Sequence, residues 1–577
     1  MRTTLRFSSC SLFSLLVMVL LANGAYAQAP NWSALATTSQ TIGNGSVVQA
    51  LAADASGNVY LAGQISGTVQ FGSTSLTANG SVSSGMYVAK WNTSASRFEW
   101  AQLITGAFMG KVNGLAVSGS TIYICGHFSG LAGFGPFSLT SQGNKDGFVA
   151  KLTDNGATGS FTWARGLGGT SDDEATALAV QGTRVYVAGS FWSPALDLGG
   201  SVVTNSGPVN TMDMFVARLS DSGAGNSLDW VQQARGTNYE DATSLAVSGT
   251  SIYVAGTFNS APSSFGSAAV SSAGGVDIYV AKLTDTGTSG NFNWVQRAGG
   301  PAYDEVGGLA VNAANVYVAG SFQGPTADFG STNLATAGIN SDIFVAKLTD
   351  GGSSGSFTWA QRAGGQNPES VTGLQVLGPY VYVAGNFTSS TIDFGSTTLR
   401  LQGGADVFVA RLLNAGSTGR FEWAKRAGGE WSDFAGDLAV QGTSVLVAGS
   451  VQPIASFDSY SVTGPVGMPP ARGTVAYVAT LNDLMLATTA ASSLAGLSVF
   501  PNPAPGRVTV QLPALSGVSQ ITVTLTDVLN RVVRAYPVGL TGEGLRQELD
   551  LTGVVPGVYL LRVQAGSAET VRRLLVK

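Results

Sequence analysis

Acidic residues recur at one position of a repeated sequence pattern. In five units an Asp or Glu stands five residues before the Leu of a short apolar run: Asp173, Glu240, Asp304, Glu369 and Asp433. In three units a second acid follows directly: Glu174, Asp241 and Glu305. If the units form a ring, these carboxylates would surround its axis and could bind a divalent cation such as Ca²⁺, or sugar hydroxyls. The alternative is that each carboxylate holds backbone N–H groups of its own unit. Units one and two carry Ser46 and Gly110 instead, so any acidic ring is incomplete.

A second acid precedes a Phe-Val-Ala-Lys-like run in five units: Asp146, Asp213, Asp277, Asp342 and Asp406. Units one and seven carry Gly85 and Val475 there. Structural capping is the favoured interpretation for this set. No segment has the Asp-x-Asp-x-Asp-Gly spacing of a calcium loop. We therefore expect no obligate cofactor or metal, with Ca²⁺ as the one ion that the acids could bind.

Few other residues have the chemistry of an active site. His127 is the only histidine, it stands where other units have varied polar residues, and no nucleophile-elbow motif accompanies it. Seven tryptophans recur at a fixed place in the units, which favours packing. Trp192 and Trp431 break the pattern and fall near loops, so they are candidates for stacking against a ligand.

The elements that position these residues are short strands repeated seven times. An aromatic-aliphatic run ending in Gly recurs at steps of 63 to 67 residues and ends at Gly63, Gly126, Gly189, Gly256, Gly320, Gly385 and Gly449. The Phe-Val-Ala-Lys-like run also occurs seven times, and so does the tryptophan run. With the Leu-Ala-Val run, each unit offers four strands. Four short antiparallel strands at this period predict a seven-bladed β-propeller.

The tryptophan run is out of phase with the other runs. Trp32 precedes every other signature, and no tryptophan run follows the last Phe-Val-Ala-Lys-like strand. The segment around Trp32 is therefore predicted to supply the outer strand of the seventh blade. Such a closure removes two strand edges that an open ring would expose.

The ends of the sequence differ from the repeats. Residues 1–27 carry two Arg, a short apolar stretch and Ala25-Tyr26-Ala27, as a signal peptide does. The leader contains two of the 29 basic residues and none of the 34 acidic ones, so the mature chain has a net charge of −7. This charge argues against a nucleic-acid partner. No other segment is long and apolar enough to predict a membrane span.

The repeats at residues 28–483 resemble the β-propeller repeat family of bacterial secreted proteins (SBBP-like), matched by the recurring Val-Tyr-Val-Ala-Gly-Ser-Phe and Asp-x-Phe-Val-Ala-Lys-Leu. A linker is predicted at 484–496, followed by a small β-sandwich at 497–577. This tail resembles the C-terminal sorting domain of the type IX secretion system through Pro501-Asn502-Pro503, Pro556-Gly557-Val558-Tyr559 and its basic end. The resemblance implies export by that machinery, with the protein released or attached to the outer cell surface.

These features favour a non-enzymatic protein for binding or adhesion at the cell surface. Its ligand would be a glycan or another surface polymer, held by the long connectors between second and third strands. The alternative is a polysaccharide hydrolase or lyase that uses carboxylates, a chemistry that two acids can perform without histidine. A spacer without any ligand is the third reading.

Overall fold

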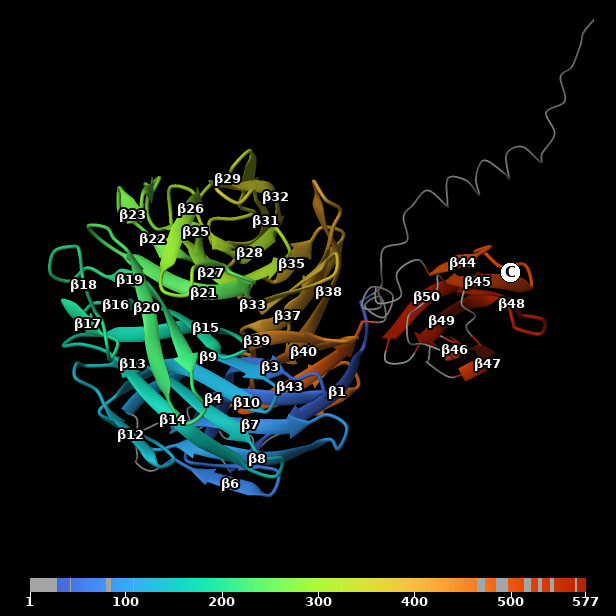
Figure 1. Cartoon of the computed structure of the whole chain (residues 1–577), viewed down its shortest axis with the longest axis horizontal. Coiled ribbons are helices and arrows are strands. Elements are labelled where there is room, and N and C mark those ends of the chain that lie inside the picture. The colour runs from blue at the N-terminus through green and yellow to red at the C-terminus, as the bar shows by residue number, and fades with distance from the viewer. Residues whose placement is uncertain are drawn as a thin grey trace, which may run out of the picture.

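The computed structural model describes residues 29–41, 43–78, 85–106, 108–463, 473–483, 497–512, 520–527, 532–539, 544–565 and 568–577. The predicted signal peptide at 1–27 and the predicted linker at 484–496 lie outside these residues. The described residues form strands, turns and loops without a helix, which confirms the all-β class. Figure 1 shows the strands gathered into a large group and a smaller C-terminal group.

The large group contains seven antiparallel sheets built on four-strand units, which we call sheets one to seven; the sixth is extended to six strands by a hairpin of the next unit. Within each sheet the strands pair in sequence order, except that β1 completes sheet seven. Sheet one has β3 (Gly45–Ala53), β4 (Asn58–Ser66), β7 (Gly85–Asn92) and β8 (Arg97–Ile104); sheet two has β9 (Phe108–Ser118), β10 (Thr121–Ser129), β13 (Asp146–Asp154) and β14 (Gly159–Leu167). Sheet three has β15 (Asp173–Gln181), β16 (Arg184–Phe191), β19 (Asp213–Asp221) and β20 (Asn226–Ala234); sheet four has β21 (Glu240–Ser248), β22 (Ser251–Phe258), β25 (Asp277–Asp285) and β26 (Gly290–Ala298). Sheet five has β27 (Asp304–Asn312), β28 (Asn315–Phe322), β31 (Asp342–Asp350) and β32 (Gly355–Ala363); sheet six has β33 (Glu369–Leu377), β34 (Tyr380–Phe387), β37 (Asp406–Asn414) and β38 (Gly419–Gly429); sheet seven has β39 (Phe434–Gln441), β40 (Ser444–Val451), β43 (Val475–Asn482) and β1 (Trp32–Thr37).

The first strands of the sheets pack against one another in a cycle. Each contacts the first strand of the sheets before and after it, and β39 contacts β3. Together they line a cavity of about 210 Å³. Each first strand also contains a bulge residue that is left out of the pairing with its second strand: Gln49, Asn113, Thr176, Thr243, Gly307, Thr372 and Gly436. Bulges bend a strand and increase its twist, and Asn113 uses its bulge to donate from Nδ2 to the Ala175 carbonyl of the next sheet at 3.0 Å.

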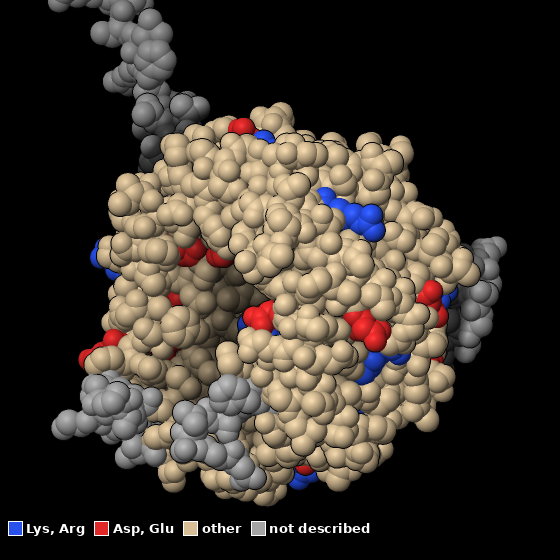
Figure 2. Space-filling view, turned by 90° about the vertical axis from the view of Figure 1, so that its left-hand side faces the viewer, with Lys and Arg blue, Asp and Glu red and all other residues tan. Residues whose placement is uncertain are grey.

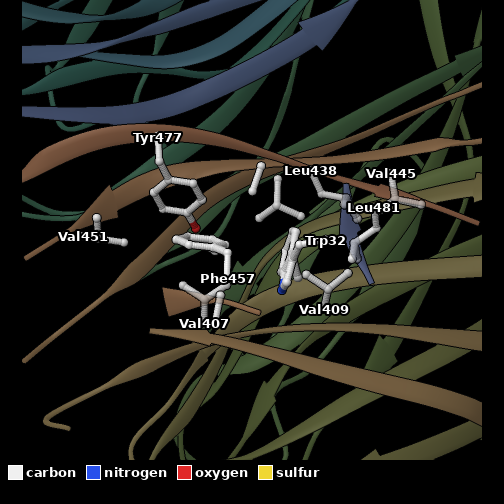
Figure 3. Packing of buried hydrophobic residues seen from close by; sticks show 14 of the residues in the cluster. Trp32, Val407, Val409, Leu438, Val445, Val451, Phe457, Tyr477 and Leu481 are labelled. Carbon is white, nitrogen blue, oxygen red and sulfur yellow. The ribbon is translucent and has the colours of Figure 1, made fainter. Parts of the chain in front are cut away.

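The N-terminal strand occupies the outer position that the sequence pattern left open in sheet seven. β1 pairs antiparallel with β43, and Trp32 is 3% exposed. The Trp32 ring lies edge-on to Phe457 with 5.2 Å between centroids, among apolar side chains of sheets six and seven (Figure 3). The sequence pattern had aligned Trp32 with the recurring tryptophans, however, and this alignment was wrong by two residues. Trp32 pairs with Leu481 as Phe161 pairs with Leu152, so Ala34 takes the place of the recurring tryptophan.

That recurring tryptophan belongs to a latch between neighbouring sheets. Asp154 of sheet two accepts hydrogen bonds from three side chains of sheet one, namely Tyr60 Oη at 2.8 Å, Lys90 Nζ at 2.6 Å and Trp100 Nε1 at 2.9 Å. The acceptors of the following sheets are Asp221, Asp285, Asp350, Asn414 and Asp483. Asn414 accepts from Trp359 Nε1 through its Oδ1 and donates from Nδ2 to Tyr317 Oη at 2.8 Å. Because these latches tie every sheet from one to seven to its neighbour, they act as side-chain bonds around the arrangement.

The junction between sheets seven and one has a different composition. Leu446 pairs with Thr480 where sheet one pairs Tyr60 with Lys90, and Thr93 stands at the acceptor position. A cavity of about 240 Å³ lies there, and its lining includes Ala34, Thr93, Leu446 and Thr480. Small side chains at the latch positions thus leave an unfilled volume at this seam.

The sequence suggested that the long connectors between second and third strands are loops, but they have secondary structure of their own. Each contains a short hairpin, and its apolar residues are buried: Phe71, Phe134, Phe265, Phe329, Phe394 and Phe457 are each 0% exposed. The hairpins are β5 (Thr68–Phe71) with β6 (Thr74–Thr77), β11 (Leu131–Phe134) with β12 (Phe137–Thr140), β17 (Ala195–Asp197) with β18 (Val202–Thr204), β23 (Ser263–Phe265) with β24 (Ala268–Val270), β29 (Thr326–Phe329) with β30 (Thr332–Ala335), β35 (Thr391–Phe394) with β36 (Thr397–Arg400), and β41 (Ala455–Phe457) with β42 (Tyr460–Val462). The short β2 (Ser39–Gln40) pairs with β5. The repeated Phe-Gly step, as in Phe329-Gly330, was the sequence signal for these hairpins.

The C-terminal group contains two sheets. The first is ordered β44 (Ser498–Phe500), β45 (Arg507–Leu512), β48 (Leu545–Asp550), and the second β47 (Val532–Gly539), β46 (Gln520–Thr526), β49 (Gly557–Ala565), β50 (Ala568–Val576). Val508 and Val510 of the first sheet share one buried apolar cluster with Leu561 and Val563 of the second. The two sheets therefore pack face to face.

Candidate functional site

A pocket of about 560 Å³ lies at the end of sheet three where β15 begins and β16 ends. It is lined by Asn144, Thr170, Ser171, Asp172, Trp192, Pro194, Asn205, Gly207, Pro208, Val209 and Asn210. Its size falls within the range of about 300–1,000 Å³ that is usual for small-molecule sites. The lining combines one aromatic ring with several amide and hydroxyl groups, and Asp172 is its one charged residue.

Trp192 follows the last residue of β16 directly and is partly exposed. Its backbone N–H donates to the Asp172 carbonyl at 2.9 Å, and its ring lies against Tyr239 with 5.2 Å between centroids and 58° between planes. Asn259 and Gln323 make the same backbone hydrogen bond in sheets four and five. The sequence-predicted stacking residue thus lies in the pocket, at a position that is otherwise polar.

The segment 205–211 contributes a further wall of the pocket, and it is longer than its counterparts in sheets one, two, four, five and six. The carboxylate of Asp213 accepts from the backbone N–H of Ser206, seven residues earlier, whereas Asp146 accepts from Gln142, four residues earlier. The longer segment is held by Asn205, whose Oδ1 accepts from Gly207 N and Thr211 Oγ1, both at 3.0 Å. At its tip Val209 is 90% exposed and Asn210 has a φ of 70°. The pocket therefore exists because this connector is extended.

Sequence reasoning missed this wall, although a signal was present. The interval from the Gly-ending strand to the following aromatic, Gly189 to Phe215, is 26 residues, against 22 to 24 in every unit except the seventh.

The five predicted ligand-binding acids are buried. Their exposed fractions are 0% for Asp173, Glu240, Asp304 and Asp433 and 2% for Glu369. Each belongs to its own sheet and hydrogen-bonds the loops next to it; Asp304, for example, accepts from Gly300 N at 2.7 Å and Gln323 N at 3.2 Å. These are the bonds of the capping alternative, and a ligand would have to displace them to reach the carboxylates. Burial raises the pKa of Asp304, Glu369 and Asp433 to about 7.

Asp173 supports the pocket from beneath. Its carboxylate accepts from Gly169 N at 2.7 Å and from Ser193 Oγ at 2.7 Å. Ser193 Oγ in turn accepts from Ser171 N at 2.8 Å. The buried Asp173 thereby fixes both the residue after Trp192 and the residues before β15, which form one side of the pocket.

The second acids, Glu174 and Asp241, are partly exposed on adjacent first strands. Glu174 forms an ion pair with Lys145, and its carboxylate lies 3.2 Å from His127 Nδ1. Burial opposes ionisation of Glu174, but its bonds to His127 and Lys145 prevail and lower its pKa to about 2. Burial raises the pKa of Asp241 to about 6, and the charge of Glu174 adds to that rise. Figure 2 shows a hollow in one face of the molecule with acidic side chains on its wall.

The structure does not bring the other exceptional tryptophan to the pocket. Trp431 lies between β38 and β39, is 36% exposed and is absent from the pocket lining. Within the described part of the chain, no group of three or more His, Cys, Asp or Glu side chains is placed to hold a metal ion. Ca²⁺ binding therefore stays a prediction. No helix among the described residues is long and apolar enough to cross a membrane.

Comparisons with known proteins bear on the tail more than on the repeats. A stretch of 271 residues, 44% of this chain, is 27% identical to the regulatory protein FlaEY of Caulobacter vibrioides. The alignment spans 28% of that protein's length. The solved structure of dimeric latent PorU from Porphyromonas gingivalis covers 76% of this chain and 32% of its own at 10% identity, with a TM-score of 0.13, which supports no inference. Residues 498–577 match the secretion system C-terminal sorting domain. The chain thus carries the sorting domain of the type IX secretion system at its C-terminal end, and it is a protein exported by that system to the cell surface or the medium.

Proposed function

We propose that the seven sheets are the blades of a β-propeller closed by β1, and that this propeller is a binding or adhesion protein at the cell surface. The cyclic packing of the seven first strands and the pairing of β1 with β43 support the fold. The sorting domain supports the location. The observation that carries the binding function is the pocket beside Trp192, because it arises where one sheet departs from the repeat.

The arrangement of the acids favours binding over catalysis. The five repeated carboxylates are buried; four of them accept backbone hydrogen bonds, and Glu240 accepts from the hydroxyl of Ser263. The hydrogen bonds that each acid makes within its own blade are enough to account for its recurrence, without a substrate. Binding requires only exposed segments on a rigid scaffold, whereas catalysis requires two carboxylates placed together in one accessible site.

One observation favours a carboxylate-dependent hydrolase or lyase as the second candidate. Glu174 and Asp241 lie on adjacent first strands, and their pKa values are driven apart to about 2 and about 6. A pair with one ionised and one protonated carboxyl can act as base or nucleophile and as general acid. The Glu174 side chain is 27% exposed, unlike Asp173 and Asp304, whereas Oδ1 of Asp241 is buried.

The two candidates are separated by incubating the secreted full-length protein with insoluble polysaccharides and with purified surface polysaccharide of the producing cell, in Ca²⁺ and in EDTA. Retention of the protein on a polymer without new reducing ends or unsaturated products is the expected result. Turnover that is lost in Glu174→Gln would establish the hydrolase or lyase instead. Neither retention nor turnover on any polymer would leave the spacer reading and overturn the proposal.

A further inference from the structure

We infer that the pocket of sheet three is a binding site for a neutral saccharide, with Trp192 as the stacking platform. This inference deepens the proposed function and rests on it, since it names the ligand class and the residues of the binding site. The pocket is separate from the ring of repeated acids at the first strands, which are buried and would form the alternative site.

The tryptophan at this position is not required by the blade. Sheets one, two, four, five, six and seven carry Ser66, Ser129, Asn259, Gln323, Thr388 and Gln452 at the equivalent place, at the end of the second strand or directly after it. The backbone hydrogen bond of Trp192 to Asp172 recurs at Asn259, Gln323 and Thr388, so the fold uses the main chain and not the ring at this place. A large apolar ring kept partly exposed beside a cavity is a feature of a binding surface.

The ring is also fixed before a ligand arrives. Tyr239 of the next sheet packs against it at 5.2 Å between centroids. Ser193, the residue that follows Trp192, is held by two hydrogen bonds that it donates to the Asp173 carboxylate. A platform whose orientation is set in the free protein loses little conformational entropy on binding.

The polar lining matches sugar hydroxyls. Thr170 and Ser171 bring hydroxyls, and Asn144 and Asn210 bring amides, groups that both donate and accept hydrogen bonds as sugar hydroxyls do. The one charged lining residue is Asp172, whose Oδ1 accepts from Asn144 Nδ2 at 2.8 Å. A carboxylate in the wall accepts hydrogen bonds from hydroxyls and repels an anionic group, so the geometry favours a neutral saccharide over an acidic one.

A proline-rich peptide is the other ligand that an aromatic site commonly takes. Such peptides dock in extended grooves lined by aromatic rings. Here Trp192 is the single aromatic residue of the lining, so the pocket lacks the row of rings that such a groove offers. The prolines at the site, Pro194 and Pro208, are part of the pocket wall. The compact volume of about 560 Å³ and the number of small polar groups suit a short oligosaccharide better.

The test measures binding of the secreted full-length protein to neutral gluco-, manno-, xylo-, galacto- and N-acetylglucosamine oligosaccharides by array and calorimetry. Purified surface polysaccharide of the producing cell forms a second arm, which tells a self-derived glycan from an external one. Acidic oligosaccharides and a proline-rich peptide form the third. We expect binding in the first or second arm, weakened at least about tenfold in Trp192→Ala and largely kept in Trp192→Phe.

Gln323→Ala is the matched control, since Gln323 occupies the same position in sheet five, and it should bind as the wild type does. Deletion of residues 208–210 shortens the connector to the usual length and provides a second variant that should lose binding while its thermal melt stays near wild type. Binding that Trp192→Ala and this deletion leave unchanged, or binding confined to the third arm, overturns the inference. If the protein still adheres to surface polymers in those cases, the proposed function stands without this site; if it adheres to nothing, both fail.

Discussion

At the scale of single residues, the buried acids show how one carboxylate can serve a repeat. Asp304 accepts backbone hydrogen bonds from Gly300 and Gln323, which lie on either side of the hairpin formed by β27 and β28. Burial makes the ionised form costly, so the pKa of this carboxyl rises to about 7. The loops at that end of sheets five, six and seven are thus held by groups that can carry a proton near neutral pH.

These raised pKa values predict a pH-dependent stability. Asp304, Glu369 and Asp433 have a pKa of about 7 in the folded state and about 4 when unfolded. The folded state therefore holds more protons between these values, and the stability that they add below pH 4 is lost as pH rises through 7. Glu174, with a pKa lowered to about 2, loses its contribution only in stronger acid. Calorimetry should give a higher Tm at pH 5 than at pH 8.

Asp304→Asn serves as the control for this prediction. Asparagine cannot ionise, so the variant should show a smaller fall in Tm between pH 5 and pH 8. A Tm that rises over this interval in the wild type would contradict the account of these carboxyls.

The latches predict the cost of a lost acceptor. In Asp350→Ala the ammonium of Lys282, which lies 2.5 Å from Asp350 and is 8% exposed in its side chain, loses its partner. Removing one member of a buried pair costs about 3–5 kcal/mol of unfolding free energy. Denaturant titration should show this loss. The natural Asn414 offers the reverse change: Asn414→Asp gives Lys347, whose pKa is lowered by burial, a carboxylate partner and should raise stability.

At the scale of elements, strand β1 closes the seventh sheet while its junction with sheet one remains the least filled. Trp32 packs against Phe457, but Ala34 stands where other sheets place a tryptophan. The chain ends thus meet beside a cavity of about 240 Å³. Closure depends on β1 pairing more than on latch side chains at this seam.

Loss of β1 contacts is therefore expected to be costly. Trp32→Ala should reduce the free energy of unfolding by about 3–5 kcal/mol, as buried aromatic truncations do, and deletion of residues 28–40 should lower Tm further. Ile339→Ala, at a residue that is 88% exposed, is the control and should change little. An unaltered melt after the deletion would refute closure by β1.

The cavity at the seam allows the opposite experiment. Ala34→Trp places the recurring tryptophan where the other sheets have it, beside Leu446 and Thr480. Cavity filling commonly adds about 0.5–2 kcal/mol. A rise in Tm is expected, and a fall would show that the seam cannot accept the ring.

Much of this architecture could be predicted from sequence, and particular residues show where prediction stopped. Regular spacing located all seven second and third strands, because strand pairing imposes that spacing. It misplaced Trp32 by two residues, since a tryptophan and a phenylalanine are interchangeable in an apolar pattern. It left Asp173 open between a ligand and a capping role, because burial depends on contacts between distant segments. Trp192 was found because it broke the repeat.

At the scale of the whole molecule, two all-β parts divide the work between them. The tail at 498–577 directs export, and the seven sheets carry the pocket. Removal of residues 498–577 is expected to abolish surface display and release. Immunoblots of medium, surface and cell fractions would show the truncated protein only inside the cell envelope; its presence in the medium at wild-type levels would be the contrary result.

In the function that we propose, the regular residues hold the sheets together while the irregular end of sheet three receives the ligand. Hydrogen exchange of the secreted protein, with and without the neutral oligosaccharide or surface polysaccharide that it retains, tests this most directly. We expect added protection confined to backbone amides near Trp192 and in the segment 205–211. Protection at the first-strand acids of every sheet, with none at Trp192, would contradict it.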